Sequence, residues 1–287
     1  MSKLKALFIS TFVTFVLVAS GYSVWRATEG PWLPWLGALL TTLPTALFVI
    51  RIYTVGDVAR TSPRMLGFIA LAAVGAAISG ASYFVGAGDE RALALAIIGL
   101  SSVVAYTYWY STLPRKPNEK LLVGQSLPEF ELETEDGCTV HSRTFLGKPL
   151  LLLFYRGNWC PLCMAQVREI SAQYRELDAL GVQVVLVSPQ PHGHTRNLAD
   201  KFEAPFQFLV DSEHRASRYL GIFAQDGLPA GLQVLGYSSD TVWPTVVITD
   251  AEGKILFADL TDNYRVRPEP STFLAVFEGG LTPNSPA

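Results

Sequence analysis

Four long apolar stretches dominate the first 113 residues and limit what this part of the chain can fold into. They cover residues 6–25, 32–50, 65–88 and 92–113. Each is about long enough to cross the roughly 30 Å hydrocarbon layer of a bilayer as a helix. One such stretch could be a buried core helix, but four in succession, separated by short charged loops, predict four transmembrane helices. Because lysines precede the first stretch, a cleaved signal peptide is the alternative for that stretch alone.

The basic residues of the short loops predict the orientation of these helices, because Lys and Arg collect on the cytoplasmic side. One side would carry only Arg26 and Arg91. The other side would carry Lys3, Lys5, Arg51, Arg60, Arg64, Arg115, Lys116 and Lys120. We therefore expect an integral protein of the bacterial inner membrane, with the domain that follows the helices facing the cytoplasm.

Small residues recur in the third stretch, where Ala72, Ala76 and Gly80 are four positions apart. Such a face allows close helix packing, either within the four-helix unit or between copies in a homo-oligomer. Beyond residue 116, thirteen Lys and Arg stand against twenty-one Asp and Glu. This acidic balance argues against nucleic acid as a partner.

The change in composition divides the chain. We expect a four-helix membrane anchor at 1–114, a charged linker at 115–121, an α/β domain at 122–280 and a flexible tail at 281–287. The pattern of the α/β domain predicts buried strands at 150–156 and 182–187, with a helix between them, which is a parallel strand–helix–strand unit. A hairpin at 245–249 and 254–258 makes the predicted sheet mixed, flanked by helices.

Cys160 and Cys163 follow the first buried strand directly and open the next helix. A helix N-terminus favours negative charge, so the pKa of Cys160 should be lowered and its nucleophilic thiolate should be accessible. Pro161 suits the first helical position because it has no N–H. Cys163 is placed to attack a mixed disulfide on Cys160. Arg156, four residues before Cys160, could favour the thiolate by its charge.

The segment Trp159-Cys160-Pro161-Leu162-Cys163, together with Trp243-Pro244-Thr245, resembles the thioredoxin superfamily. The opening residues 123–130 and the Asp136-Gly137 turn resemble its redoxin branch, the AhpC/TSA or peroxiredoxin-like proteins. The resemblance covers roughly 120–279 and implies a thioredoxin-like fold. It also implies that Pro244 is a cis-proline, that Trp243 offers main-chain hydrogen bonds to a partner, and that Thr245 and Trp159 flank the disulfide.

These residues predict a membrane-anchored thiol–disulfide oxidoreductase without a cofactor, with Cys160 as the nucleophile and Cys163 as the resolving thiol. Its partners would be the lipid bilayer and protein or low-molecular-weight disulfides and thiols, glutathione among them. Thioredoxin has a buried acid six residues before its nucleophile, but here that position is Phe154, so another group would have to move the proton.

Two alternatives stay open. The first is an antioxidant thiol peroxidase, because peroxiredoxins share the branch. In their Pro-x-x-x-Thr-x-x-Cys pattern, however, Leu153 and Gly157 take the proline and threonine places, and the arginine of those enzymes is not evident. The second is a zinc-stabilised interaction module, because Cys138-x-x-His141 and the Cys160/Cys163 pair have the spacing of a Cys3His site. His192 and His194 are expected in a polar loop, and no metal site is expected there.

Overall fold

The computed structural model describes residues 3–202 and 204–279 and divides into two compact units. One, the helical unit, consists of Leu4–Asp57 and Thr61–Thr112. The other, the C-terminal unit, consists mainly of the chain from Leu113 onward. The predicted tail at 281–287 lies outside the described residues. Each unit is described below by itself.

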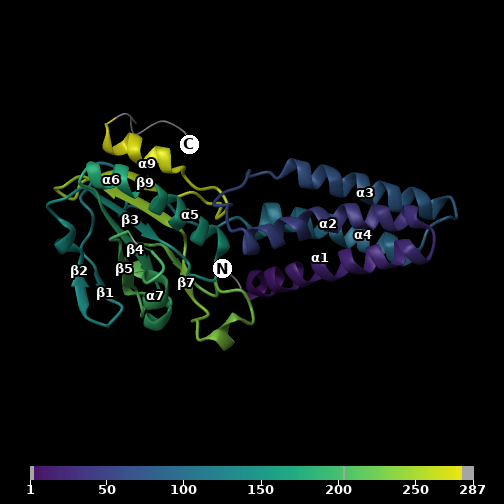
Figure 1. Ribbon diagram of the computed structural model, residues 1–287, viewed down its shortest axis with the longest axis horizontal. Helices are drawn as coiled ribbons and strands as arrows, with labels where there is room; N and C mark the ends of the chain where they lie inside the picture. The colour runs from purple at the N-terminus through teal and green to yellow at the C-terminus, as the bar shows by residue number, and fades with distance from the viewer. Residues whose placement is uncertain (1–2, 203, 280–287) are drawn as a thin grey trace. The chain divides into compact units, whose positions relative to one another are not determined.

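The helical unit contains α1 (Lys3–Glu29), α2 (Trp32–Thr54), α3 (Leu66–Phe84) and α4 (Glu90–Ala105), and α4 continues into a π-helical turn at Tyr106–Tyr110 (Figure 1). The prediction of four long apolar helices is confirmed, and by length and composition each of them could cross a membrane. The first helix extends beyond its apolar stretch at both ends, because Lys3, Arg26 and Glu29 are good helix formers and only their side chains need water.

Helices α2 and α3 approach each other through small residues. A Cβ atom at Gly37 would collide with the backbone of Gly75, and the Ser79 hydroxyl donates to the Pro34 carbonyl oxygen at 2.7 Å. The buried face of α3 is Ala72, Gly75, Ser79 and Ser82. The predicted face is confirmed at Ala72, which is buried, and at Ala76, which packs against the buried cluster of α2 and α4, whereas a Cβ atom at Gly80 would have only Leu93 within 4 Å. Steps of four residues turn through 400°, so such a row drifts away from the contact, whereas alternating steps of three and four stay on it.

The C-terminal unit is built on a seven-stranded mixed sheet in the order β2-β1-β5-β4-β3-β8-β9. The central strand β3 (Leu150–Phe154) runs parallel to β4 (Gln183–Ser188) and antiparallel to β8 (Thr245–Thr249). All five residues of β3 are fully buried, and each buried Leu contributes about 1.5–3 kcal/mol. The outer strands are β1 (Glu131–Glu133), β2 (Thr139–His141), β5 (Gln207–Val210) and β9 (Ile255–Asp259). The predicted mixed sheet with helices is confirmed.

The helices of this unit lie between and after the strands along the chain (Figure 1). The predicted helix that follows the cysteines is two helices, α5 (Pro161–Ala172) and α6 (Tyr174–Ala179), because Gln173 leaves the helical conformation. Residues His192 and His194 lie in the first turn of α7 (His192–Ala199) and not in a loop, since Pro191 caps that helix. The remaining elements are α8 (Arg215–Tyr219), the short pair β6 (Phe223–Ala224) and β7 (Thr241–Val242), the 3-10 helix Leu232–Leu235, and α9 (Pro270–Phe277).

A buried histidine makes the stability of this unit depend on pH. His214 is 6% exposed, and its ring packs edge-on against the Phe223 ring with the two ring centroids 5.3 Å apart. Neither nitrogen of the His214 ring has a hydrogen-bond partner among the described residues. Burial lowers the pKa of His214, Asp211 and Asp240 oppose this shift, and Arg218 adds to it. Below the ordinary pKa of 6.5, the His214 side chain is protonated in the unfolded chain but stays neutral in the folded chain until the pH is lower.

We therefore expect the free energy of unfolding to fall as pH drops below about 6.5, with a slope of up to about 1.4 kcal/mol per pH unit. The measurement is the thermal unfolding midpoint of the full chain between pH 5 and 8. His214→Asn, which cannot titrate and tolerates the left-handed backbone of this position (φ 56°), should remove the slope. An unchanged slope in this variant would assign the pH dependence to another group.

A candidate thiol redox site

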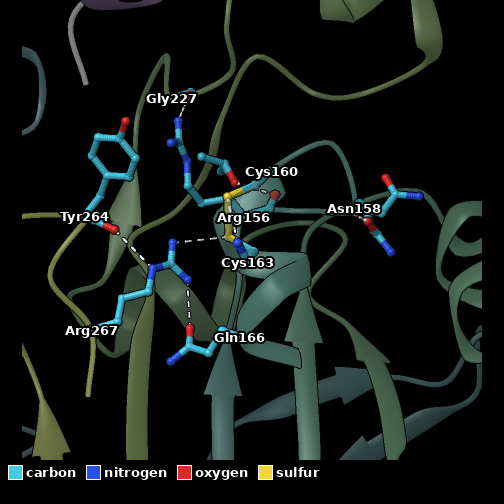
Figure 2. Close-up of a disulfide and its surroundings, with 10 residues drawn as sticks. Arg156, Asn158, Cys160, Cys163, Gln166, Gly227, Tyr264 and Arg267 are labelled. Atoms are coloured by element: carbon cyan, nitrogen blue, oxygen red, sulfur yellow. Dashed lines mark hydrogen bonds between the residues drawn. A yellow bond between two sulfur atoms is a disulfide. The ribbon is translucent and has the colours of Figure 1, made fainter. Parts of the chain in front are cut away.

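Strand β3 and helix α5 bring the two cysteines together. Cys160 is the N-cap of α5, Pro161 is its first residue, and the backbone N–H of Cys163 donates to Cys160 Sγ at 3.3 Å. The two cysteines form a disulfide, and their Cα atoms are 5.3 Å apart (Figure 2). The disulfide thus closes a Cys-x-x-Cys pair at the start of a helix. In the reduced state the same N–H would stabilise a Cys160 thiolate.

The turn between β3 and α5 is held from outside by polar side chains. Gly157 has φ of +145°, and a Cβ atom there would collide with the Trp159 side chain, so glycine is required. The backbone N–H of Asn158 donates to Gln190 Oε1 at 2.8 Å, and the Tyr237 hydroxyl donates to Asn158 Oδ1. These contacts leave the residues before Cys160 little freedom.

Both sulfur-bearing residues are buried. Cys160 is 2% exposed and Cys163 is fully buried. The expectation that Cys160 is openly accessible was therefore wrong for this oxidised state. The side chain of Arg156 contributes to the enclosure. Its guanidinium carbon lies 4.6 Å from the centroid of the Trp159 ring, and its Nη2 donates to the Gly227 carbonyl oxygen. A molecule that reacts with Cys160 must be small or must displace part of this enclosure.

A second arginine, which sequence reasoning missed, lies directly at the disulfide. Arg267 Nη2 donates to Cys163 Sγ at 3.4 Å, Nη1 to Gln166 Oε1 at 2.7 Å, and Nε to the Tyr264 carbonyl oxygen at 3.1 Å (Figure 2). The sequence pattern gave no sign of this arginine, and nothing in the structure equates it with the arginine of the peroxiredoxins. Arg267 follows β9 and is 104 residues from Cys163, so no local motif marks it.

The charge of Arg267 persists at neutral pH. Burial lowers its pKa to about 10, with the nearby charge of Arg156 as a further cause. Even this pKa leaves the guanidinium protonated at pH 7. Two buried guanidinium groups therefore give the site a positive field, and Arg267 favours a thiolate on Cys163. Thioredoxin has a buried acid where this chain has Phe154. The charge of Arg267 stabilises the thiolate directly, so water can accept the proton in place of that acid.

The segment that carries Trp243 and Pro244 is closed to a partner strand. No cis peptide bond occurs among the described residues, so Pro244 is trans and the expected cis-proline was wrong. The Trp243 N–H donates to the Ile222 carbonyl oxygen at 2.7 Å, and the Trp243 carbonyl oxygen accepts from the Thr245 hydroxyl at 2.9 Å. Both main-chain groups expected to bind a partner are thus occupied by the small β6–β7 region and by Thr245.

Arg115, which the sequence places in the linker, braces this segment. Its Nη2 donates to the Pro244 carbonyl oxygen at 2.6 Å and to Thr245 Oγ1 at 3.1 Å, and its Nε donates to the Thr261 carbonyl oxygen at 2.7 Å. The guanidinium also lies 5.4 Å from the Trp243 ring centroid. Burial lowers the pKa of Arg115 to about 10, so it too stays charged at neutral pH. One side chain therefore ties the turn before β8 to the chain that follows β9.

We expect Arg115→Gln to destabilise the C-terminal unit. The substitution leaves main-chain carbonyl groups without donors, which costs about 2 kcal/mol and lowers the unfolding midpoint by roughly 4–8 °C. The measurement is thermal unfolding followed by tryptophan fluorescence. Lys116→Gln, a change in the exposed neighbouring residue, is the matched control and should leave the midpoint unchanged. Equal shifts in both variants would contradict the bracing role of Arg115.

The four residues of the proposed zinc site do not come together. Cys138 and His141 lie at β2, an outer strand that three strands separate from β3, and Cys138 is an exposed free thiol. Within residues 3–202 and 204–279 no group of three or more His, Cys, Asp or Glu residues could hold a metal ion. The geometry therefore does not support the zinc alternative.

Comparison with known proteins shows which family the C-terminal unit is similar to. Residues 123–258 match the model of the AhpC/TSA family. This matching segment, which we call the AhpC/TSA domain, covers a little under half of the chain. The chain is 28% identical over 144 residues to chloroplastic peroxiredoxin Q of Populus jackii, which covers 50% of this chain and 63% of that protein. It is 31% identical over 104 residues to peroxiredoxin Bcp of Bacillus subtilis, covering 35% of this chain and 64% of that protein.

The AhpC/TSA domain thus spans somewhat less than two thirds of the length of these two relatives. Among solved structures, the chain is similar to peroxidoxin BcpB of Mycobacterium tuberculosis, with a TM-score of 0.45 and 17% identity over 56% of this chain and 98% of that one. The AhpC/TSA match ends at residue 258, so Arg267 and the whole helical unit lie outside it.

Proposed function

We propose that the AhpC/TSA domain is a peroxiredoxin-like thiol peroxidase. In the first step the Cys160 thiolate attacks a peroxide oxygen. An S–O bond forms, the O–O bond breaks, and Cys160 becomes a sulfenic acid as water or an alcohol leaves. Cys163 then attacks the Cys160 sulfur, which forms the disulfide and releases water. A thiol donor supplies two electrons and two protons to regenerate the dithiol.

The observation that carries this proposal is the enclosed disulfide with Arg267 on Cys163. The site offers a positive field and almost no exposed sulfur, which suits a small oxidant better than a protein chain. The occupied main chain of Trp243 also disfavours the docking of a partner strand. Peroxiredoxin relatives at 28–31% identity support the same choice.

A thiol–disulfide oxidoreductase is the second candidate. The specific observation in its favour is that the peroxiredoxin threonine position holds Gly157, so the site lacks that hydroxyl. The adjacent Cys-x-x-Cys pair also suits exchange with disulfides. Its substrates would be protein disulfides or small ones such as oxidised glutathione, and the supporting residues proposed for it are Trp159, Pro161, Trp243, Pro244 and Thr245, of which Pro244 and Thr245 are buried.

One experiment separates the two candidates. The purified full chain is given dithiothreitol as donor and either hydrogen peroxide or insulin, whose disulfides report protein disulfide reduction. We expect peroxide to be consumed at least about 10² times faster than insulin disulfides are reduced, because the closed site excludes a chain but admits a molecule the size of water. Insulin reduction without peroxide consumption would replace the peroxidase by the oxidoreductase.

We further propose that α1–α4 anchor the domain in a membrane, with the domain on the cytoplasmic side and with packing between copies as a route to oligomers. The four apolar helices and the excess of basic loops on one side support this orientation. Cys138 is a reporter already present, because its thiol is exposed and free. In intact cells an impermeant maleimide should not label Cys138 until the membrane is opened, and labelling before that step would reverse the orientation.

A further inference from the structure

A cavity of about 460 Å³ lies within the C-terminal unit and shares no residue with the disulfide or with Arg156 and Arg267. One wall is the segment after the last apolar helix, from Pro114 to Lys120. The opposite wall consists of residues 218–221, Phe223 and Trp243. The proposed peroxidase reaction uses no residue of this cavity.

The lining of the cavity is positively charged. It contains three cationic side chains, Lys116, Lys120 and Arg218, and one acidic side chain, Glu119. The Arg218 guanidinium is also 3.6 Å from Asp240, outside the lining. Lys116 has no ion-pair partner among the described residues. The arrangement is suited to an anion.

Two of these cations are held in place by aromatic rings of the same cavity. Lys120 Nζ lies 3.6 Å from the ring centroid of Tyr219 and donates to the Tyr219 carbonyl oxygen at 2.6 Å. The Arg218 guanidinium lies 3.5 Å from the ring centroid of Phe223. Cation–π contacts of this kind restrict the charged groups before a ligand arrives.

We propose that this cavity binds the phosphate headgroup of an anionic membrane phospholipid. Tyr110, the last residue of the apolar helices, and Lys116 are six residues apart, which limits their separation to about 20 Å. A phosphate-bearing surface is therefore within reach of this wall when the helices cross a membrane. Basic residues close to a membrane surface attract anionic headgroups. The proposal rests on the proposed membrane insertion and not on the redox chemistry.

The test uses the full chain in a neutral detergent, oxidised and without peroxide or thiol. Dihexanoyl phosphatidylglycerol, dihexanoyl phosphatidylcholine and inorganic phosphate are titrated in separate arms by calorimetry. We expect saturable binding of the phosphatidylglycerol, and about 25-fold weaker binding in the double variant Lys116→Gln/Arg218→Gln, or about fivefold for each lost cation. Lys201→Gln, a change in an exposed lysine outside the cavity, should not weaken binding.

Three results would overturn the proposal. These are equal binding of the zwitterionic phosphatidylcholine, equal binding of inorganic phosphate, which would assign the site to a soluble anion, and full binding by the double variant. Because the assay needs no turnover, an inactive peroxidase leaves its outcome unaffected. Extraction of membranes with alkaline carbonate tests the insertion separately.

Discussion

Replacing Cys160 by serine should reduce peroxide consumption to the uncatalysed background, a loss on the order of 10³-fold or more, because the nucleophile is removed while the rest of the site stays intact. The same change should abolish any reduction of insulin disulfides. The measurement is peroxide consumption by the full chain with dithiothreitol as donor. Cys138→Ser, a change in the exposed free thiol far from the disulfide, is the matched control and should keep full activity.

Cys163→Ser distinguishes the roles of the two sulfurs. This variant should consume about one peroxide per chain in the absence of donor and then stop, with a sulfenic acid on Cys160 that a dimedone reagent traps. Because Arg267 contacts Cys163 and not Cys160, the opposite result is informative. A Cys160→Ser chain that still performs the single turnover would make Cys163 the nucleophile.

Arg267→Gln should have the second largest effect on the redox reaction of the cysteine pair. It removes the charged partner of Cys163 Sγ and leaves Gln166 Oε1 and the Tyr264 carbonyl oxygen without their donor. A hydrogen bond to a charged group contributes about 1.5–3 kcal/mol, so we expect disulfide formation to slow roughly 10- to 100-fold and the pKa of Cys163 to rise. The measurement is the pH dependence of Cys163 alkylation in the reduced Cys160→Ser background.

Two variants control this result. Arg267→Lys keeps the positive charge but loses the planar guanidinium with its several directed donors. It should therefore keep the pKa of Cys163 closer to the wild-type value than Arg267→Gln does, while the hydrogen bond to Gln166 is weakened. Arg175→Gln, a change in an exposed arginine on α6, should alter neither quantity. If Arg267→Gln lowers only the unfolding midpoint and leaves the alkylation profile unchanged, the arginine is structural and does not act on the sulfur.

Much of the candidate site follows from local patterns. The run 150–154, with only apolar side chains, can be buried on both faces of a sheet and becomes the central strand. Cys160 and Pro161 follow at the spacing that places them at a helix start. The four apolar stretches are long enough to be recognised one at a time. In each case the residues that decide the structure lie within about twenty positions of each other.

The sequence by itself thus determined the cysteine pair at the start of α5, the mixed sheet that presents it and the four apolar helices. Only the tertiary structure decided that Arg267 reaches Cys163, that Arg115 and the β6–β7 region occupy the main chain around Pro244, and that both cysteines are buried. The physical reason is distance along the chain. These contacts join residues that are from about twenty to more than a hundred positions apart, and they depend on the order of strands in the sheet, which no local period of hydrophobicity or charge records.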